Sequence, residues 1–132
     1  MPLYIGKEVI MWIKYNANPI AARVGDCTIR AISKATEQDW ESTYMDICVE
    51  GLFLHDMPSS NATWGSYLHR LGWRRYIVPT TNCTIREFCE DHPKGRYILA
   101  LSGHVVACID GNLFDTWDSS DEIVMYYWQK EK

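Results

Sequence analysis

The sequence lacks the cysteine spacing of a zinc site. Its five cysteines stand at positions 27, 48, 83, 89 and 108, and no two of them form a CxxC pair. Cys83 and Cys89 are the nearest neighbours among them, and their separation is not a usual zinc-ligand spacing. We therefore expect no metal site and no cofactor. Most of these thiols are expected to be reduced and buried as small hydrophobic side chains.

Long uninterrupted apolar runs are also missing. No stretch approaches the length that crosses a bilayer. The N-terminal residues carry Lys7, Glu8 and Lys14 among their apolar side chains, so they lack the continuous apolar core of a signal peptide. These absences predict a cytoplasmic protein that has no membrane partner.

Basic residues are in short supply. Lys and Arg together number 13 against 17 Asp and Glu, which gives a net charge of −4. A dedicated nucleic-acid-binding protein usually has a basic footprint, so we expect no nucleic-acid partner. One small basic group, formed by His69, Arg70, Arg74 and Arg75, surrounds Gly72. A solvated helix end explains this group better than a binding site does, because nothing extends it elsewhere.

What the sequence does contain is enough apolar material for one core. Of its 132 residues, 47% are hydrophobic, and six Trp and eight Tyr supply large side chains. We predict a single domain over residues 1–132, without repeats or linkers. Helical spacing and capping signals predict helices at 27–35, 39–50, 61–71 and 85–91. Alternating and β-branched segments predict strands at 9–15, 73–78, 96–101, 104–109, 113–117 and 124–129.

The predicted helices lie mostly in the first part of the chain and the predicted strands mostly in the last part, and this order is typical of an α+β fold. We expect an N-terminal helical layer, with Cys27 on its first helix, packed on a C-terminal antiparallel sheet of about four to six strands. Gly51 is expected to end the second helix. The aromatic run Tyr126, Tyr127 and Trp128 on the last strand is the candidate contact for a homodimer.

Cys27 is the cysteine with the strongest claim to chemistry. It lies in the first turn of a predicted helix, where unpaired N–H groups and the helix dipole stabilise a thiolate. The preceding Asp26 raises a thiol pKa by its charge, unless its carboxylate is turned to the backbone as the helix N-cap. Position alone leaves a buried structural cysteine as the alternative.

A hairpin near the C-terminus supplies a base and an acid. Asp110-Gly111-Asn112 is a strong hairpin signal. A two-residue turn at Asp110-Gly111 or at Gly111-Asn112 puts His104 and Asp115 on one face, and the first of these two registers makes them diagonal neighbours. A base and its orienting carboxylate need this proximity. A three-residue loop would instead place Asp118 opposite His104, so Asp118 is the substitute acid.

The order of these residues resembles that of the papain-like cysteine peptidase superfamily. Gly25-Asp26-Cys27-Thr28 occupies the place of the nucleophile motif, and Gly103-His104-Val105-Val106 is similar to the histidine strand. The run Asp115-Thr116-Trp117-Asp118 resembles the Asn-Ser-Trp of papain-type enzymes, in which the Trp shields the hydrogen bond of the His. The whole chain is similar to small papain-like proteins of phages and bacteria, which for a phage protein implies the host cytoplasm.

The chain departs from that superfamily at the oxyanion hole. Papain-type enzymes carry a Gln six residues before the Cys, and this position is Ala21 here. Asn16 and Asn18 lie in the right loop to supply an amide donor instead. The alternative is that both side chains form Asx turns around Pro19.

These features predict a cysteine hydrolase that acts on a peptide or amide bond of a peptide or protein substrate. Cys27 would be the nucleophile, His104 the base and Asp115 its orienting acid, with Trp117 and Asp26 in support. The missing Gln and the acidic neighbour of Cys27 favour the alternative, a catalytically inactive papain-like module, such as a phage protein that binds a host component.

Overall fold

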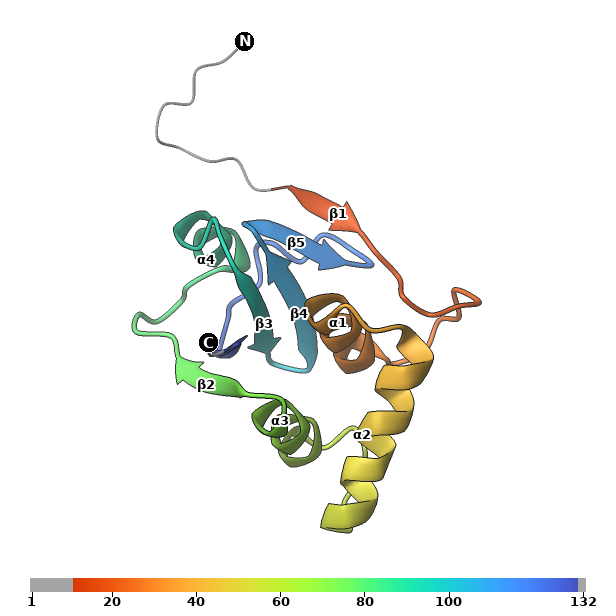
Figure 1. The fold of residues 1–132 in the computed structure, drawn as a ribbon. Coiled ribbons are helices and arrows are strands. Elements are labelled where there is room, and N and C mark those ends of the chain that lie inside the picture. Colours follow the sequence, from red (N-terminus) through yellow and green to blue (C-terminus); the bar gives the residue numbers. More distant parts are fainter. Residues whose placement is uncertain (1–10, 131–132) are drawn as a thin grey trace.

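The computed structural model describes residues 11–130, and within them the fold is α+β (Figure 1). Four helices occur in this range, α1 (Cys27–Thr36), α2 (Trp40–Leu54), α3 (Asn61–Arg70) and α4 (Ile85–Asp91). Six strands accompany them, β1 (Trp12–Lys14), β2 (Trp73–Ile77), β3 (Arg96–Leu101), β4 (His104–Ile109), β5 (Asn112–Asp115) and β6 (Tyr126–Lys130). Each predicted element has a counterpart, although the predicted first strand begins outside the described residues.

The strands form one mixed sheet in the order β1-β5-β4-β3-β6-β2. The expectation of a purely antiparallel sheet is wrong, because β1 runs parallel to β5 and pairs Trp12 with Leu113 and Lys14 with Asp115. The neighbours β5, β4, β3, β6 and β2 are antiparallel to one another. The tight turns after β3 and after β4 force these strands to alternate in direction, whereas β1 reaches the sheet from a distant part of the chain and is free of that constraint.

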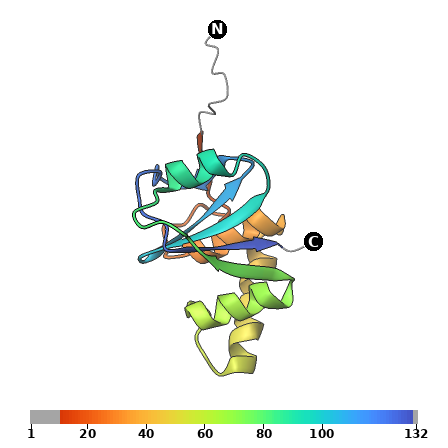
Figure 2. The same cartoon turned by 90° about the vertical axis from the view of Figure 1, so that its left-hand side faces the viewer.

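Helices cover both faces of the sheet (Figure 2). On one face, side chains of α1, α2 and α3 form a core with Ile98 and Ala100 of β3 and with Ala107 of β4. On the other face, α4 packs on Leu99 and Val106 among others. This alternation along each strand follows from the two-residue period of β-structure. The predicted helical layer therefore accounts for one face only.

Local capping signals set where the helices begin. Thr84 and Glu87 form a reciprocal capping box at the start of α4, with hydrogen bonds of 3.1 and 3.0 Å between side chain and backbone. The Ser60 side chain accepts a hydrogen bond from the backbone of Ala62 and caps α3. These caps confirm the predicted starts of both helices.

Gly51 does not end α2, contrary to the prediction. It lies inside the helix, which continues to Leu54 and ends at His55, a residue in the left-handed conformation with φ of 55°. A methyl group at Gly51 would lie 2.8 Å from the carbonyl oxygen of Asp56. The glycine therefore allows the returning chain to approach the helix closely, rather than stopping the helix.

The aromatic run of β6 contributes to the interior of the molecule. Trp128 is buried, and Tyr127 packs against Phe88 of α4 with ring centroids 4.8 Å apart. Homodimerisation remains a prediction without an assigned surface. Among residues 11–130, the longest helices are too short or too polar to span a membrane.

Candidate active site

His104 and Asp115 meet at one end of the sheet, where β4 begins and β5 ends. The turn between these strands has two residues, Asp110 and Gly111, so Cys108 pairs with Leu113 as the first of the two predicted registers requires. Nε2 of His104 lies 2.7 Å from Oδ2 of Asp115. The diagonal proximity expected from the sequence is therefore present in the structure.

The carboxylate of Asp115 is buried and firmly held. The Ser119 hydroxyl donates a hydrogen bond to Oδ2 at 2.6 Å, and the backbone N–H of Thr116 donates one to Oδ1 at 2.8 Å. The neighbouring strand β1 fixes the backbone of the same residue, since Tyr15 N–H donates to the Asp115 carbonyl at 2.9 Å. These bonds fix the orientation of the acid that faces the imidazole.

Cys27 begins α1 beside the imidazole. Its burial alone would raise the pKa of the thiol, but hydrogen bonds from His104 and from the backbone N–H of Val105, with the positive charges of His104 and Arg30, lower the pKa below its ordinary value. Since Nε2 of His104 is bonded to Asp115, Nδ1 is the ring nitrogen left for the thiol. The three side chains thus form a continuous chain of contacts.

His104 is held in its charged form by the same contacts. Burial lowers the pKa of the imidazole, but the hydrogen bond to Asp115 and the contact with Cys27 outweigh it and raise the pKa to about 9. A raised imidazole pKa beside a lowered thiol pKa shifts the two groups toward a thiolate–imidazolium pair. Such a pair provides a nucleophile and a proton donor in contact with each other.

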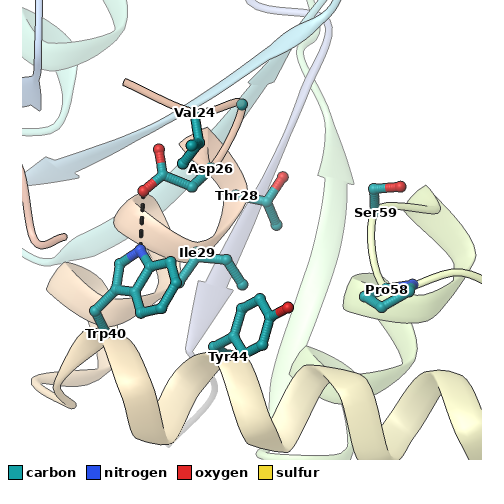
Figure 3. A pocket seen from close by; sticks show the side chains of 9 residues that line it. Val24, Asp26, Thr28, Ile29, Trp40, Tyr44, Pro58 and Ser59 are labelled. Carbon is teal, nitrogen blue, oxygen red and sulfur yellow. Dashed lines mark hydrogen bonds between the residues drawn. The ribbon is translucent and has the colours of Figure 1, made fainter. Parts of the chain in front are cut away.

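Asp26 precedes α1 as predicted, but its side chain does not cap the helix. Its buried carboxylate instead accepts hydrogen bonds from Arg30 and from Nε1 of Trp40, the latter at 2.8 Å (Figure 3). Arg30 also lies 3.8 Å from Asp115, so one guanidinium compensates both acids. Sequence analysis assigned no role to Arg30, although its position four residues after Asp26 is the spacing of a helical ion pair.

Trp117 and Asp118 follow Asp115 and differ in their positions. The Trp117 ring lies against His104, with centroids 5.3 Å apart, and covers one side of the imidazole while remaining 46% exposed. Asp118 is turned away and accepts hydrogen bonds from the backbone and hydroxyl of Ser120. The two-residue turn excludes the register that would have placed Asp118 opposite His104.

Asn16 and Asn18 form the Asx turns that were the alternative reading of their loop. The Asn16 side-chain oxygen accepts from the backbone of Asn18, and the Asn18 oxygen accepts from the backbone of Ile20. Asn16 lines a cavity with Trp117 that does not contain Cys27. Neither Asn16 nor Asn18 lines the cleft that holds Cys27 and His104.

A cleft of about 430 Å³ contains the side chains of both Cys27 and His104. Asn61, the first residue of α3, lines this cleft, and its side-chain oxygen accepts a hydrogen bond from Trp64 at 3.0 Å. That bond leaves the Asn61 NH₂ group as a donor. Sequence analysis attributed no function to Asn61, and no local signal connects it with Cys27, because their proximity depends on how α3 packs.

Within residues 11–130, no group of three or more His, Cys, Asp or Glu side chains is arranged to hold a metal ion. No family model, curated protein or solved structure matches the chain. The case for a function therefore depends on the geometry of the site itself.

Proposed function

We propose that this protein is a papain-like cysteine hydrolase that cleaves a peptide or amide bond by acyl transfer. The observation that carries the proposal is that Nε2 of His104 lies 2.7 Å from Asp115, while the imidazole lines one cleft with Cys27 and lowers the pKa of its thiol. A buried acid, an imidazole and a thiol in this order are the components of an activated cysteine nucleophile.

Each residue has a defined role in the proposed reaction. The Cys27 thiolate attacks the carbonyl carbon, and a C–S bond forms as the carbonyl oxygen becomes an oxyanion. The His104 imidazolium gives its proton to the leaving nitrogen, and the C–N bond breaks to leave a thioester. His104 then takes a proton from water, whose oxygen displaces the thiolate and releases the acid. Asp115 stabilises the charged imidazole throughout.

The oxyanion needs donors that face the carbonyl oxygen. The backbone N–H of Cys27 lies at the first position of α1, where helical N–H groups have no partner within the helix. The NH₂ group of Asn61 is the side-chain donor that we propose from the residues around the cleft. This pair would substitute for the Gln that the sequence lacks at Ala21.

The activated thiol is tested by its alkylation. We expect iodoacetamide to label Cys27 rapidly well below the ordinary thiol pKa of about 8.5, and His104→Ala to abolish this rapid phase. Peptide mapping by mass spectrometry follows each cysteine separately, with half-buried Cys48 as the reference thiol in the same molecule. Labelling of Cys27 that follows an ordinary thiol titration in both proteins would leave the inactive binding module as the better explanation.

The Asn61 donor is tested by comparing two reagents. Acylation of Cys27 by p-nitrophenyl acetate passes through an oxyanion, whereas alkylation by iodoacetamide does not. We expect Asn61→Ala to slow acylation by about 100- to 1000-fold, while alkylation keeps its rate. Asn18→Ala is the matched control, and a larger effect there than at Asn61 would return the role to the loop before α1.

A further inference from the structure

A second cavity has a volume of about 380 Å³, and its wall includes Asp26 and Thr28, the neighbours of Cys27 in the sequence. Figure 3 shows the side chains that line it. Its walls come from the chain before α1, from α1 and α2, and from the loop before α3. The lining residues are Val24, Gly25, Asp26, Thr28, Ile29, Trp40, Tyr44, Pro58 and Ser59. The residues on both sides of Cys27 in the sequence thus belong to this wall.

This pocket adjoins the cleft that holds the reacting groups. Gly25, Thr28 and Ser59 line both cavities and form their common border. The strand that carries His104 contributes no lining residue to the pocket, and neither does Trp117. The pocket therefore extends from Cys27 on the side away from the imidazole.

The lining is apolar and offers no free charge. Trp40 and Tyr44 lie one turn apart on α2 and stack with centroids 5.0 Å apart, and Ile29 faces them from α1 (Figure 3). Asp26 is the acidic residue in the wall, and its carboxylate is already occupied by Trp40 and Arg30. A charged side chain would lose its hydration here without gaining a partner, whereas an apolar one would gain by burial.

The position of His104 decides which half of a substrate reaches this pocket. The leaving nitrogen must approach His104 to receive its proton, so the leaving half of the substrate extends toward the imidazole and Trp117. The acyl half must then extend in the other direction, across Gly25 and Thr28. The pocket defined above lies in that direction.

We propose that the pocket formed by Val24, Ile29, Trp40, Tyr44 and Pro58 binds a large apolar side chain, best an aromatic one, from the acyl half of a peptide substrate. This inference rests on the proposed function and specifies its substrate class. A volume of about 380 Å³ accommodates an aromatic ring, and the Trp40–Tyr44 stack provides a flat surface for it.

Peptidyl chloromethyl ketones test the inference directly. Their peptide occupies the acyl side while the thiolate displaces chloride, so a C–S bond forms as the C–Cl bond breaks. Each compound is an N-acetyl dipeptide chloromethyl ketone. One of its two residues is Phe, Ala or Lys and the other is Ala, so that each position is varied separately. We expect Phe at one position to react about tenfold faster than Ala or Lys. Each rate is divided by the iodoacetamide rate of the same protein.

Two variants of α2 connect this preference to the pocket. Tyr44→Glu puts a charge in the wall and should reduce the Phe-over-Lys ratio at that position to about threefold or less. Met45→Glu is the matched control, because Met45 is an exposed neighbour that does not line the pocket. The control should keep the full preference.

The outcomes separate this inference from the proposed function. Equal rates for Phe, Ala and Lys at both positions, or a preference for Phe that survives Tyr44→Glu, would overturn the pocket assignment. Neither result would contradict the proposed activation of Cys27. If iodoacetamide instead shows an ordinary thiol, the proposed function fails. The same set of ketones at about pH 9.5, where any exposed thiol ionises, would still decide whether the pocket selects an apolar side chain.

Discussion

At the scale of single residues, the Asp115 carboxylate governs the electrostatics of the site. It is buried, it bonds His104 and Ser119 through one oxygen, and its other oxygen lies near Arg30. A buried acid needs such partners, because an unpaired charge away from water is costly. The partners also keep the carboxylate available to the imidazole in one orientation.

Replacing Asp115 should therefore change the titration of His104. Burial lowers the pKa of His104, and the Asp115 bond is the main cause that raises it, to about 9 in total. We expect Asp115→Asn to bring this pKa down toward the ordinary value of 6.5, as followed by NMR of the imidazole protons. Asp118→Asn, which alters an exposed acid bonded to Ser120, should leave it unchanged.

The same pair predicts a dependence of stability on pH. Because the folded-state pKa of His104 lies above the unfolded value, its stabilisation is complete below pH 6.5 and is lost as the pH rises through about 9. The difference in unfolding free energy between wild type and Asp115→Asn should shrink over that range. A difference that grew with pH would contradict the assigned ion pair.

Much of the site at this scale could be predicted from the sequence. The hairpin signal at 110–112 was sufficient to put His104 and Asp115 on one face, because either two-residue turn keeps them on the same side of the sheet. The structure selects the turn at Asp110-Gly111, which makes them diagonal neighbours. Arg30 could have been found by its helical spacing from Asp26. Asn61 could not, since its place in the cleft depends on the packing of separate helices.

At the scale of elements, local rules predicted where helices begin better than where they end. Ser60 and Thr84 cap helices through bonds within three residues, so the signal and its effect are adjacent in the chain. Gly51 resembled a stop signal, but it lies inside α2, where the absence of a side chain lets the carbonyl of Asp56 approach as the chain turns back. The parallel pairing of β1 with β5 could not be predicted either, because no local sequence pattern determines the direction in which two distant strands pair.

Gly51→Ala gives a test of that contact. Alanine favours a helix over glycine by about 1 kcal/mol, so propensity alone predicts stabilisation. We expect a loss of about 1–2 kcal/mol instead, because the new methyl group meets the Asp56 carbonyl and the backbone must shift. Urea unfolding measures the change, and Gly25→Ala, with open space around its added methyl, should stay within about 0.5 kcal/mol.

At the scale of the whole molecule, the sheet is buried between two helical layers. The layer of α4 closes over β4 through Cys89 and Cys108, whose sulfur atoms lie 3.0 Å apart and are inaccessible to solvent. The hydrogen bond with Cys89, together with burial, raises the pKa of the Cys108 thiol. These two thiols should therefore report on the integrity of the complete fold.

We expect iodoacetamide to spare Cys89 and Cys108 in the native protein during the time in which Cys27 is fully labelled. Their labelling should appear with increasing urea, in parallel with the loss of helical circular dichroism, because only unfolding exposes them. Half-buried Cys83 is the control that remains accessible without urea. Labelling of Cys108 at the rate of Cys83 in the absence of urea would contradict the packing of α4.

The bond between Trp12 and the Asp115 carbonyl joins residues 103 positions apart. During synthesis on the ribosome, Cys27 emerges long before the strands that carry His104 and Asp115. Until then it lacks His104 and the backbone N–H of Val105, which supply the hydrogen bonds that lower the pKa of its thiol. The thiol therefore acquires these partners only after β4 and β5 have been synthesised and have folded onto α1.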